Sequence, residues 1–452
     1  MRIAVIGGGI SGLVAAYRLR QRLGEGADIV VVEQGPRLGG VLHTGELAGE
    51  PLDLGAEAFV GRRPEVIELM GELGLDDQLV RPAGKRPLVW AQGVAHPLPG
   101  RTLMGIPSDA ESLRGLVDEE TLERVAAETQ RPLAWPPGDD VSVHSLVADR
   151  FGAQVVERSV DPLLGGVYAG ISASIGVRAA LPALADALDG GAPSLTDAVR
   201  QAMPAPSTAP VFGGLRDGYG TLIAALTEAS AARVVTTLAA TRIAAAPRGW
   251  VVDPLGLVDA VVLATPAPVT ARLLHYVAPE AAAAAGEIEL SSSALVALAL
   301  PRDTVLPDNS GILVASGEPL RAKAFTLSSR KWPHLAERDV ALVRASFGRF
   351  GDDSLLSWSD DDLVAAAVAD LSTVTGIPIT PVASAVQRWP GGLPQYAPGH
   401  TTRIATLESA IAPLDGLAVA GAYLHGVGVP ACVATGTAAA DRIAKSLTSR
   451  VE

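Results

Sequence analysis

The sequence has little cysteine, few aromatic residues and no excess of basic charge. Its one cysteine, Cys432, excludes a disulfide within the chain and a cysteine-based metal site, and it favours a reducing compartment. The seven histidines are scattered without the spacing of metal ligands, so we expect no metal centre. The formal net charge is −13 at pH 7 and no basic run occurs, so nucleic-acid binding is not expected.

Long apolar runs are also absent. No stretch has the roughly 18 consecutive apolar residues that a membrane-spanning helix needs. The N-terminal stretch lacks the long apolar core and cleavage site of a signal peptide. We therefore expect a cytoplasmic protein without a membrane span. Peripheral contact with a membrane and the oligomeric state stay open.

The first glycine cluster is the strongest local signal in what is present. RIAVI is typical of a buried strand, the residues from 11 to 23 have helical apolar spacing, and DIVVVE is typical of a second strand. Gly7, Gly9 and Gly12 form GxGxxG between the first strand and the helix, where they permit a tight turn, close approach of a pyrophosphate and close helix packing. Glu33 ends the second strand, where its carboxylate can accept from ribose hydroxyls. The pattern predicts a dinucleotide site; the alternative is a purely structural turn.

Further motifs resemble the flavin-binding amine oxidase and protoporphyrinogen oxidase superfamily. QGPRLGG follows Glu33 and matches the run whose Arg37, Gly39 and Gly40 contact the FAD diphosphate. DLGAEAF matches the loop near the flavin ring, and ATRI matches the segment that holds the adenine, at Ala240. The tail GLAVAGAYLHGVGVPACVATG matches the closing strand, loop and helix, whose N–H groups and positive helix end would stabilise a reduced flavin.

The resemblance implies a set of contacts with FAD. The predicted cofactor-binding residues are Gly7, Gly8, Gly9, Ile10, Ser11, Gly12, Glu33, Gln34, Arg37, Gly39, Gly40, Val41, Gly55, Ala56, Glu57, Ala58, Ala240, Trp389, Val427, Gly428 and Val429.

The implied fold is α/β, because nucleotide-binding patterns stand at both ends of the chain with unlike material between them. At 452 residues the chain is also too long for one compact domain. We expect a discontinuous Rossmann-like FAD-binding domain, an inserted mixed α+β substrate domain and a mainly helical subdomain. The predicted parts are 1–84, 206–268 and 388–452 for FAD binding, 85–205 for a mainly helical substrate-lining region, and 269–387 for a β-rich substrate domain.

The stretch RWPGGLPQYAPGH, from Arg388 to His400, indicates one family within this superfamily. Its Pro and Gly content predicts neither regular helix nor strand. It resembles a signature of the protoporphyrinogen and coproporphyrinogen oxidase family, as do GVGVPACVATG, SVDPLLGGVYAG and GIPSD. The resemblance covers essentially the whole chain and is closest to the soluble Gram-positive, actinobacterial branch. Trp389 is then expected beside the flavin and Tyr396 as a brace of the same loop; the alternative is that they fill gaps in the core.

The family resemblance implies oxidation of coproporphyrinogen III to coproporphyrin III in haem biosynthesis. Six electrons leave in three two-electron steps, each with hydride transfer to the flavin and loss of a pyrrole proton, and dioxygen reoxidises the flavin to give peroxide. The stretch from 390 to 399 has no cysteine, so FAD should be non-covalent. We identify no catalytic base.

Four propionates on the substrate require Arg or Lys partners. The resemblance indicates Arg86 first and Lys85 second, with Tyr168 and Leu313 as walls for the ring; the alternatives are surface charges and ordinary core residues. Some family members have Arg where Glu57 stands, so a propionate contact is not expected there. Glu57 is expected to face polar groups near the flavin.

Other functions stay open at this point. Protoporphyrinogen IX oxidation is the nearest alternative, because the choice of porphyrinogen depends on lineage and not on particular residues. An amine oxidase or a carotenoid desaturase would use the same scaffold. A flavin-free binding protein on this scaffold would be expected to have lost the glycine motif and the tail motif. Both motifs are intact in this sequence, which disfavours that alternative. Contact with a haem-pathway enzyme is also open.

Overall fold

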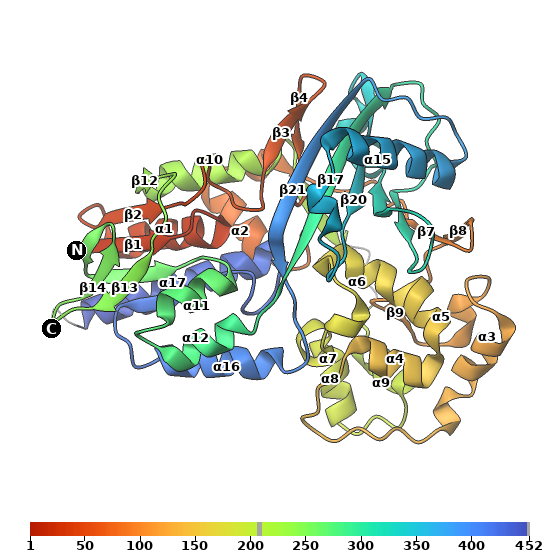
Figure 1. Cartoon of the computed structure of the whole chain (residues 1–452), viewed down its shortest axis with the longest axis horizontal. Helices are drawn as coiled ribbons and strands as arrows, with labels where there is room; N and C mark the ends of the chain where they lie inside the picture. Colours follow the sequence, from red (N-terminus) through yellow and green to blue (C-terminus); the bar gives the residue numbers. More distant parts are fainter. Residues whose placement is uncertain (206–209, 450–452) are drawn as a thin grey trace.

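The computed structural model describes residues 1–205 and 210–449. A five-stranded sheet forms the lobe at the left of Figure 1, in the order β12-β2-β1-β16-β22, and its paired strands are parallel. The strands are β1 (Arg2–Ile6), β2 (Asp28–Val32), β12 (Arg233–Val235), β16 (Ala260–Leu263) and β22 (Leu417–Val419).

Helices cover both faces of this sheet, because successive strand residues point to opposite faces and both sets are apolar. One face packs against α1 (Ile10–Leu23), α10 (Tyr219–Ser230) and α17 (Val429–Thr448). The other packs against α11 (Ala267–Leu274), α12 (Pro279–Gly286) and α16 (His400–Ile411). Strands from the start, middle and end of the chain therefore share one core, which confirms the discontinuous nucleotide-binding fold.

A second sheet has seven strands in the order β21-β17-β20-β19-β18-β7-β8. All its pairs are antiparallel except β18–β7. The strands are β7 (Leu88–Ala91), β8 (Val94–Pro97), β17 (Leu290–Pro301), β18 (Gly311–Val314), β19 (Ala322–Thr326), β20 (Val340–Phe347) and β21 (Ala383–Pro394). Helix α15 (Asp360–Thr375) covers one face (Figure 1).

A helical region lies below this sheet in Figure 1. It consists of α3 (Glu119–Ala126), α4 (Val143–Phe151), α5 (Ala153–Val155), α6 (Asp161–Tyr168), α7 (Val177–Ala180), α8 (Pro182–Asp189) and α9 (Leu195–Ala202). A buried ion pair joins Arg150 to Glu128 at 2.7 Å, and the carboxylate of Glu128 also accepts from the Leu195 N–H at the start of α9. This contact anchors α9 to the preceding helices.

Shorter elements connect these parts. They are β3 (Thr44–Leu47), β4 (Glu50–Asp53), β5 (Phe59–Val60), α2 (Glu65–Glu72), β6 (Leu79–Val80), β9 (Thr102–Leu103), β10 (Ile106–Pro107), β11 (Phe212–Leu215), β13 (Arg242–Ala245), β14 (Trp250–Asp253), β15 (Gly256–Val258), α13 (Ser328–Lys331) and α14 (Pro333–Ala336).

The expectation that the stretch from Arg388 onward contains no regular strand is wrong, because its first seven residues end β21. β21 is an edge strand, and three of its residues, Pro390, Gly391 and Gly392, stand opposite Ser292 alone. An edge position and a bulge remove the need for ladder hydrogen bonds at Pro390, so the strand tolerates it. The stretch is therefore a bulged strand end that leads into α16.

Three predicted domain boundaries divide packing units of the structure. β7 and β8 lie within the segment 85–205 but belong to the seven-stranded sheet. The boundary between 268 and 269 falls inside α11, and both α11 and α12 pack on the parallel sheet. The boundary between 387 and 388 falls inside β21. The predicted division of the chain into domains stays a prediction.

Candidate functional site

A cavity of about 340 Å³ lies where β1, β2 and β16 end. The carboxyl ends of parallel strands are the usual ligand site in open α/β sheets. Segments from the whole chain line the cavity: Ile6, Gly7, Gly9, Ile10, Ser11, Val32, Glu33, Gln34, Gly39, Gly40, Val41, Leu238, Ala239, Ala240, Ala264, Thr265, Pro266, Ala267, Val269, Leu290, Trp389, Pro390, Gly391, Gly392, Pro394, Gly421, Ala422, Tyr423 and Cys432.

The glycine turn forms a cradle at one wall of this cavity. Gly7 has a φ of +108°, and a Cβ there would lie 2.2 Å from the Ala264 carbonyl oxygen. A Cβ on Gly12 would lie 2.0 Å from the Gly7 carbonyl oxygen, so α1 approaches β1 as closely as glycine alone allows. A Cβ on Gly9 would meet open space within the cavity. This wall is therefore free to receive a diphosphate.

Helix α1 also begins at this wall without a side-chain cap, since Gly9 is its N-cap residue. Free N–H groups and the positive end of the helix dipole suit a diphosphate. Glu33 lines the cavity nearby, and its carboxylate accepts from the N–H groups of Gly8 at 2.8 Å and Gly35 at 2.7 Å. A cradle for a diphosphate beside an acid for a ribose fits a dinucleotide such as FAD.

Trp389 brings the second sheet into the cavity wall. Its indole N–H donates to the Leu54 carbonyl oxygen at 3.0 Å, and the Arg37 guanidinium carbon lies 5.4 Å from the ring centre. A Cβ on Gly55 would lie 3.3 Å from the indole ring. The DLGAEAF segment thus supports the wall through Trp389, although Gly55 itself is not part of the cavity surface.

The structure brings about half of the predicted cofactor-binding residues to the cavity surface, and their binding role stays a prediction. The predicted residues outside the lining are Gly8, Gly12, Arg37, Gly55, Ala56, Glu57, Ala58, Val427, Gly428 and Val429. Val429 begins α17, and Gly428 is its N-cap residue without a side-chain cap.

Glu57 is not part of the cavity surface. Its buried carboxylate pairs with Lys331 at 2.5 Å and with Arg344 at 2.6 Å. Burial opposes ionisation, but the two cations outweigh it and lower the Glu57 pKa to about 2. Arg344 also donates to the Gly55 carbonyl oxygen. Glu57 therefore locks the loop after β4 to β20, which a single sequence does not reveal because both partners lie far along the chain.

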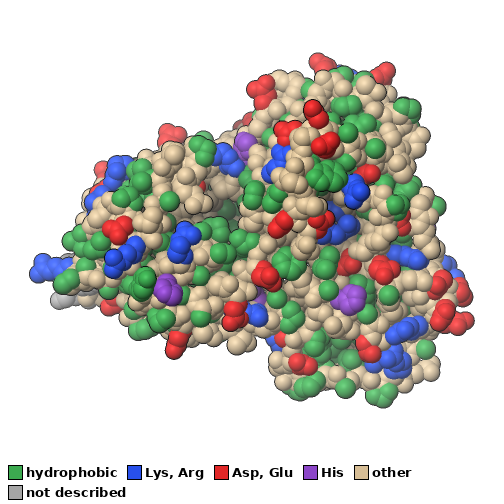
Figure 2. Space-filling model, in the orientation of Figure 1, with side chains coloured by type: hydrophobic (Ala, Val, Ile, Leu, Met, Phe, Trp, Pro, Cys, Tyr) green, Lys and Arg blue, Asp and Glu red, His purple; other side chains and the backbone are tan. Residues whose placement is uncertain are grey.

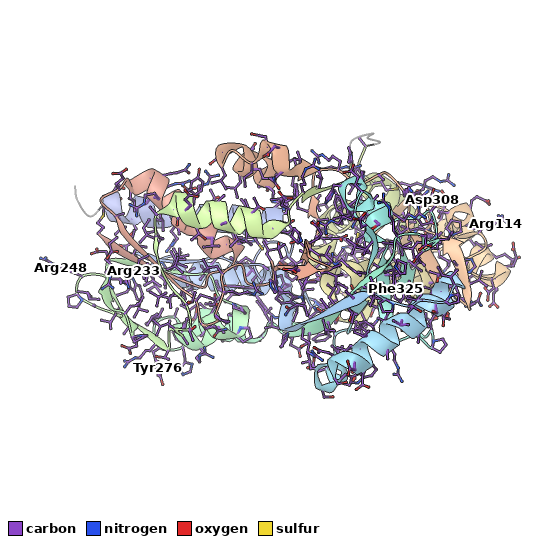
Figure 3. The ribbon with its side chains drawn as sticks, turned by 90° about the horizontal axis from the view of Figure 1, so that it is seen from above. Arg114, Arg233, Arg248, Tyr276, Asp308 and Phe325 are labelled. Atoms are coloured by element: carbon purple, nitrogen blue, oxygen red, sulfur yellow. The ribbon has the colours of Figure 1, made fainter. Side chains whose placement is uncertain are left out.

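The predicted propionate partners Arg86 and Lys85 lie away from the cavity. The Arg86 guanidinium donates to the Leu98 carbonyl oxygen at 2.9 Å, and Lys85 pairs with Asp308. Figure 3 shows Asp308 at the opposite end of the molecule from Arg233 of β12 in the parallel sheet. Arg86 is exposed and Lys85 is half-buried, and their role toward the substrate stays a prediction.

The predicted ring walls Tyr168 and Leu313 share one apolar cluster, in which Leu313 is partly buried. The rings of Tyr168 and Tyr396 lie 5.7 Å apart. The side-chain amide of Gln395, next to the cavity residue Pro394, donates to the Tyr168 carbonyl oxygen at 2.8 Å. Tyr168 is therefore close to one end of the cavity wall.

Tyr396, expected as a brace of its own loop, forms a clamp with His400 on the loop between β22 and α17, and the prediction named neither His400 nor that loop. The Tyr396 hydroxyl donates to the Ala422 carbonyl oxygen at 2.6 Å and accepts from the Gly426 N–H at 2.7 Å. The His400 ring stacks on the Tyr396 ring, with 3.9 Å between the ring centroids. Ala422 lines the cavity, so the clamp holds the loop between β22 and α17 in place. The partners are backbone groups, which leave no signal in a sequence.

Cys432 lines the cavity but is buried, and burial raises its pKa to about 11. The thiol form therefore predominates at neutral pH, and the side chain acts as a small apolar group. The prediction did not name other lining residues, among them Thr265 and Pro266, which follow β16.

Within residues 1–205 and 210–449, no helix is both long and apolar enough to cross a membrane. The same described part of the chain has no group of three acidic, His or Cys residues that could hold a metal ion. On the face shown in Figure 2, acidic and basic side chains are interspersed.

Comparison with known proteins gives a consistent result. Residues 10–444 match the family described as flavin containing amine oxidoreductase. Coproporphyrinogen III oxidase of Mycobacterium tuberculosis H37Rv is 52% identical over 451 residues, which cover 99% of this chain and 98% of the relative. The Bacillus subtilis enzyme of the same name is 29% identical, covering 97% and 96%.

Among solved structures, a protein of Exiguobacterium sp. 255-15, provisionally assigned as a protoporphyrinogen oxidase, superimposes with a TM-score of 0.87. It is 29% identical, and the match covers 98% of each chain.

Proposed function

The chain belongs to the flavin containing amine oxidoreductase family, and on that premise we propose that it is an FAD-dependent coproporphyrinogen III oxidase of haem biosynthesis. FAD is its cofactor. One observation carries the proposal: the chain is 52% identical to the mycobacterial coproporphyrinogen III oxidase over 451 residues, which are 99% of this chain.

The residues of the cavity suit a tightly held, non-covalent dinucleotide. The α1 N-terminus and the cradle of Gly7 and Gly9 would hold the diphosphate, Glu33 the ribose, and the Ala240 segment the adenine. Trp389 would stand against the flavin end of the cavity. Bound FAD supplies a two-electron acceptor, and we propose dioxygen as the final oxidant.

The reaction removes six electrons from the macrocycle in three rounds, so the protein must hold a large flat substrate through repeated oxidation. Its role in this proposal is to position the ring against the cofactor and to exclude water. We place the reaction in the cytoplasm, and contact with a membrane surface or with another haem-pathway enzyme remains compatible with the proposal.

The direct test has two parts. The purified protein should be yellow and should release FAD on denaturation. Oxidation of coproporphyrinogen III and of protoporphyrinogen IX is then followed by porphyrin fluorescence, and we expect the higher kcat/KM for coproporphyrinogen III. A colourless protein that takes up no FAD would refute the flavoenzyme assignment.

Protoporphyrinogen IX oxidation is the second candidate, favoured by the name of the similar Exiguobacterium structure and of the rice chloroplast relative, which is 27% identical. Equal or higher kcat/KM on the two-propionate substrate would establish it in place of the first.

A further inference from the structure

The sequence contains four lysines, at positions 85, 323, 331 and 445. Lys85 pairs with Asp308 and Lys331 pairs with Glu57. Lys445 is exposed on α17. Lys323 differs from all three, because it is 7% exposed and no ion pair joins it to an acid in the part of the chain that the structure describes. Its ammonium donates one hydrogen bond, to the Gly348 carbonyl oxygen at 2.7 Å.

A second, half-buried cation lies beside Lys323. Arg349 follows Gly348, and its guanidinium donates to the Val314 carbonyl oxygen at 3.1 Å. The nearby acid is Asp161, whose oxygens already accept from the Ser172 N–H at 2.9 Å and the Ser316 hydroxyl at 2.8 Å. Burial, with a contribution from Arg349, lowers the Lys323 pKa to about 7. Burying a cation without a carboxylate partner is costly, so Lys323 requires an explanation.

Lys323 is linked to the cavity wall through Gly348 and Ser292. It occupies an irregularity of β19 between Ala322 and Ala324; Figure 3 labels Phe325 two positions further along this strand. A Cβ on Gly348 would lie 2.7 Å from the Ser292 carbonyl oxygen. The Ser292 hydroxyl accepts from the Gly391 N–H at 3.1 Å, and Gly391 lines the cavity.

The same region contains the expected ring walls. Leu313 of β18 pairs with Ala324, the neighbour of Lys323, and α6, which ends at Tyr168, packs against β18 and β19. Both cations therefore lie near the contact of the second sheet with α6, and Lys323 is linked to the cavity residue Gly391 through Gly348 and Ser292.

We propose that Lys323, with Arg349 beside it, is a carboxylate-binding subsite that receives a propionate of the substrate and favours the four-propionate over the two-propionate macrocycle. This inference rests on the proposed function. An ammonium has three donors, and one is engaged by Gly348, so a carboxylate can replace or join that contact with a charge-assisted hydrogen bond. A macrocycle without a propionate at this point makes no such contact, so it lacks the favourable binding free energy that the four-propionate macrocycle gains there.

The test uses binding of the oxidised products to the FAD-loaded protein, followed by porphyrin fluorescence. Lys323→Met keeps the length of the side chain and removes its charge, and Lys445→Met is the matched surface control. We expect the Kd of coproporphyrin III to rise about tenfold or more in Lys323→Met, as for loss of one charge-assisted hydrogen bond, while the Kd of protoporphyrin IX changes less than threefold. Lys445→Met should change neither.

The outcomes separate the two proposals. Unchanged coproporphyrin affinity in a folded, FAD-loaded Lys323→Met protein would overturn the subsite while leaving the proposed function intact, and so would an equal loss for both porphyrins. Wild-type protein that binds and oxidises neither porphyrinogen would instead overturn the proposed function. Arg349→Met provides an independent variant, expected to shift the two Kd values in the same direction as Lys323→Met.

Discussion

At the scale of single residues, the structure separates side chains that share a motif but act differently. Tyr396 and Trp389 stand in one signature stretch, yet Trp389 forms part of the cavity surface while Tyr396 is buried behind it and bonds to the loop above α17. Trp389 would contact a ligand directly, whereas Tyr396 would act through the loop that it positions.

Replacing Tyr396 by Phe should therefore weaken FAD binding. The change removes the hydrogen bonds to Ala422 and from Gly426, so we expect the Kd of FAD to rise about tenfold, with an altered flavin absorption spectrum. Tyr17→Phe is the matched control, because the Tyr17 hydroxyl also has two partners, Glu72 and Gln21, but is remote from the cavity lining. Equal loss of FAD affinity in both variants would show that Tyr396 contributes only general stability.

Asp53 should make stability depend on pH. Burial raises its pKa to about 6, although its carboxylate accepts from Thr44 and from the Tyr219 N–H. Between pH 4 and 6 the folded state thus binds more protons at Asp53 than the unfolded state does. The free energy of unfolding therefore falls as pH rises through this range, by up to about 3 kcal/mol, and Asp53 adds no further pH dependence above it. In Asp53→Asn this part of the pH dependence should vanish, as measured by urea unfolding at pH 4.5 and 6.5. An unchanged pH profile would mean that Asp53 is ionised in the folded protein.

At the scale of elements, side-chain caps define the ends of helix α15, whereas backbone contacts define the junction of β1 and α1. Helix α15 begins after Ser359, whose hydroxyl accepts from the Asp362 N–H, and ends at Gly376 with a φ of +71°. These caps fix both ends of the helix, which spans Asp360–Thr375. The junction of β1 and α1 depends instead on contacts between backbones.

Two substitutions by alanine at this junction should have different effects. In Gly12→Ala the new Cβ collides with the Gly7 carbonyl oxygen, so the thermal midpoint should fall by several degrees with or without FAD. In Gly9→Ala the Cβ enters open space, so the FAD-free midpoint should stay unchanged while the Kd of FAD rises tenfold or more. Differential scanning fluorimetry with a flavin titration measures both. Normal FAD affinity in Gly9→Ala would show that the cradle does not hold the diphosphate.

At the scale of the whole molecule, the cavity joins segments that are far apart in the chain. Residues near 10, 240, 265, 390 and 422 meet around it, and the clamp and Trp389 connect the two sheets through its wall. A ligand that contacts all these segments binds the folded state and not the unfolded state. Its binding therefore raises the free energy of unfolding of the whole protein.

Removal of FAD should accordingly lower the thermal stability of the entire protein. At free FAD about 100 times its Kd, binding contributes about 2.7 kcal/mol, which predicts a midpoint several degrees above that of the FAD-free protein. The shift should depend on FAD concentration and be absent with riboflavin, which lacks the diphosphate that the α1 terminus would bind. Equal stabilisation by riboflavin would contradict the predicted orientation of the cofactor.

The sequence alone determined the parts of this protein that depend on short-range chemistry. GxGxxG before a helix, Glu33 at a strand end and the capped helix over 360–375 follow from rules about neighbouring residues. The family signatures supplied the cofactor and the fold. Only the tertiary structure decided that Glu57 pairs with Lys331 and Arg344 and that Arg86 lies on the surface. It also decided that Lys323 is buried and pairs with no acid among the described residues. These depend on contacts across hundreds of residues, and the electrostatics of a charged side chain are set by what surrounds it in space.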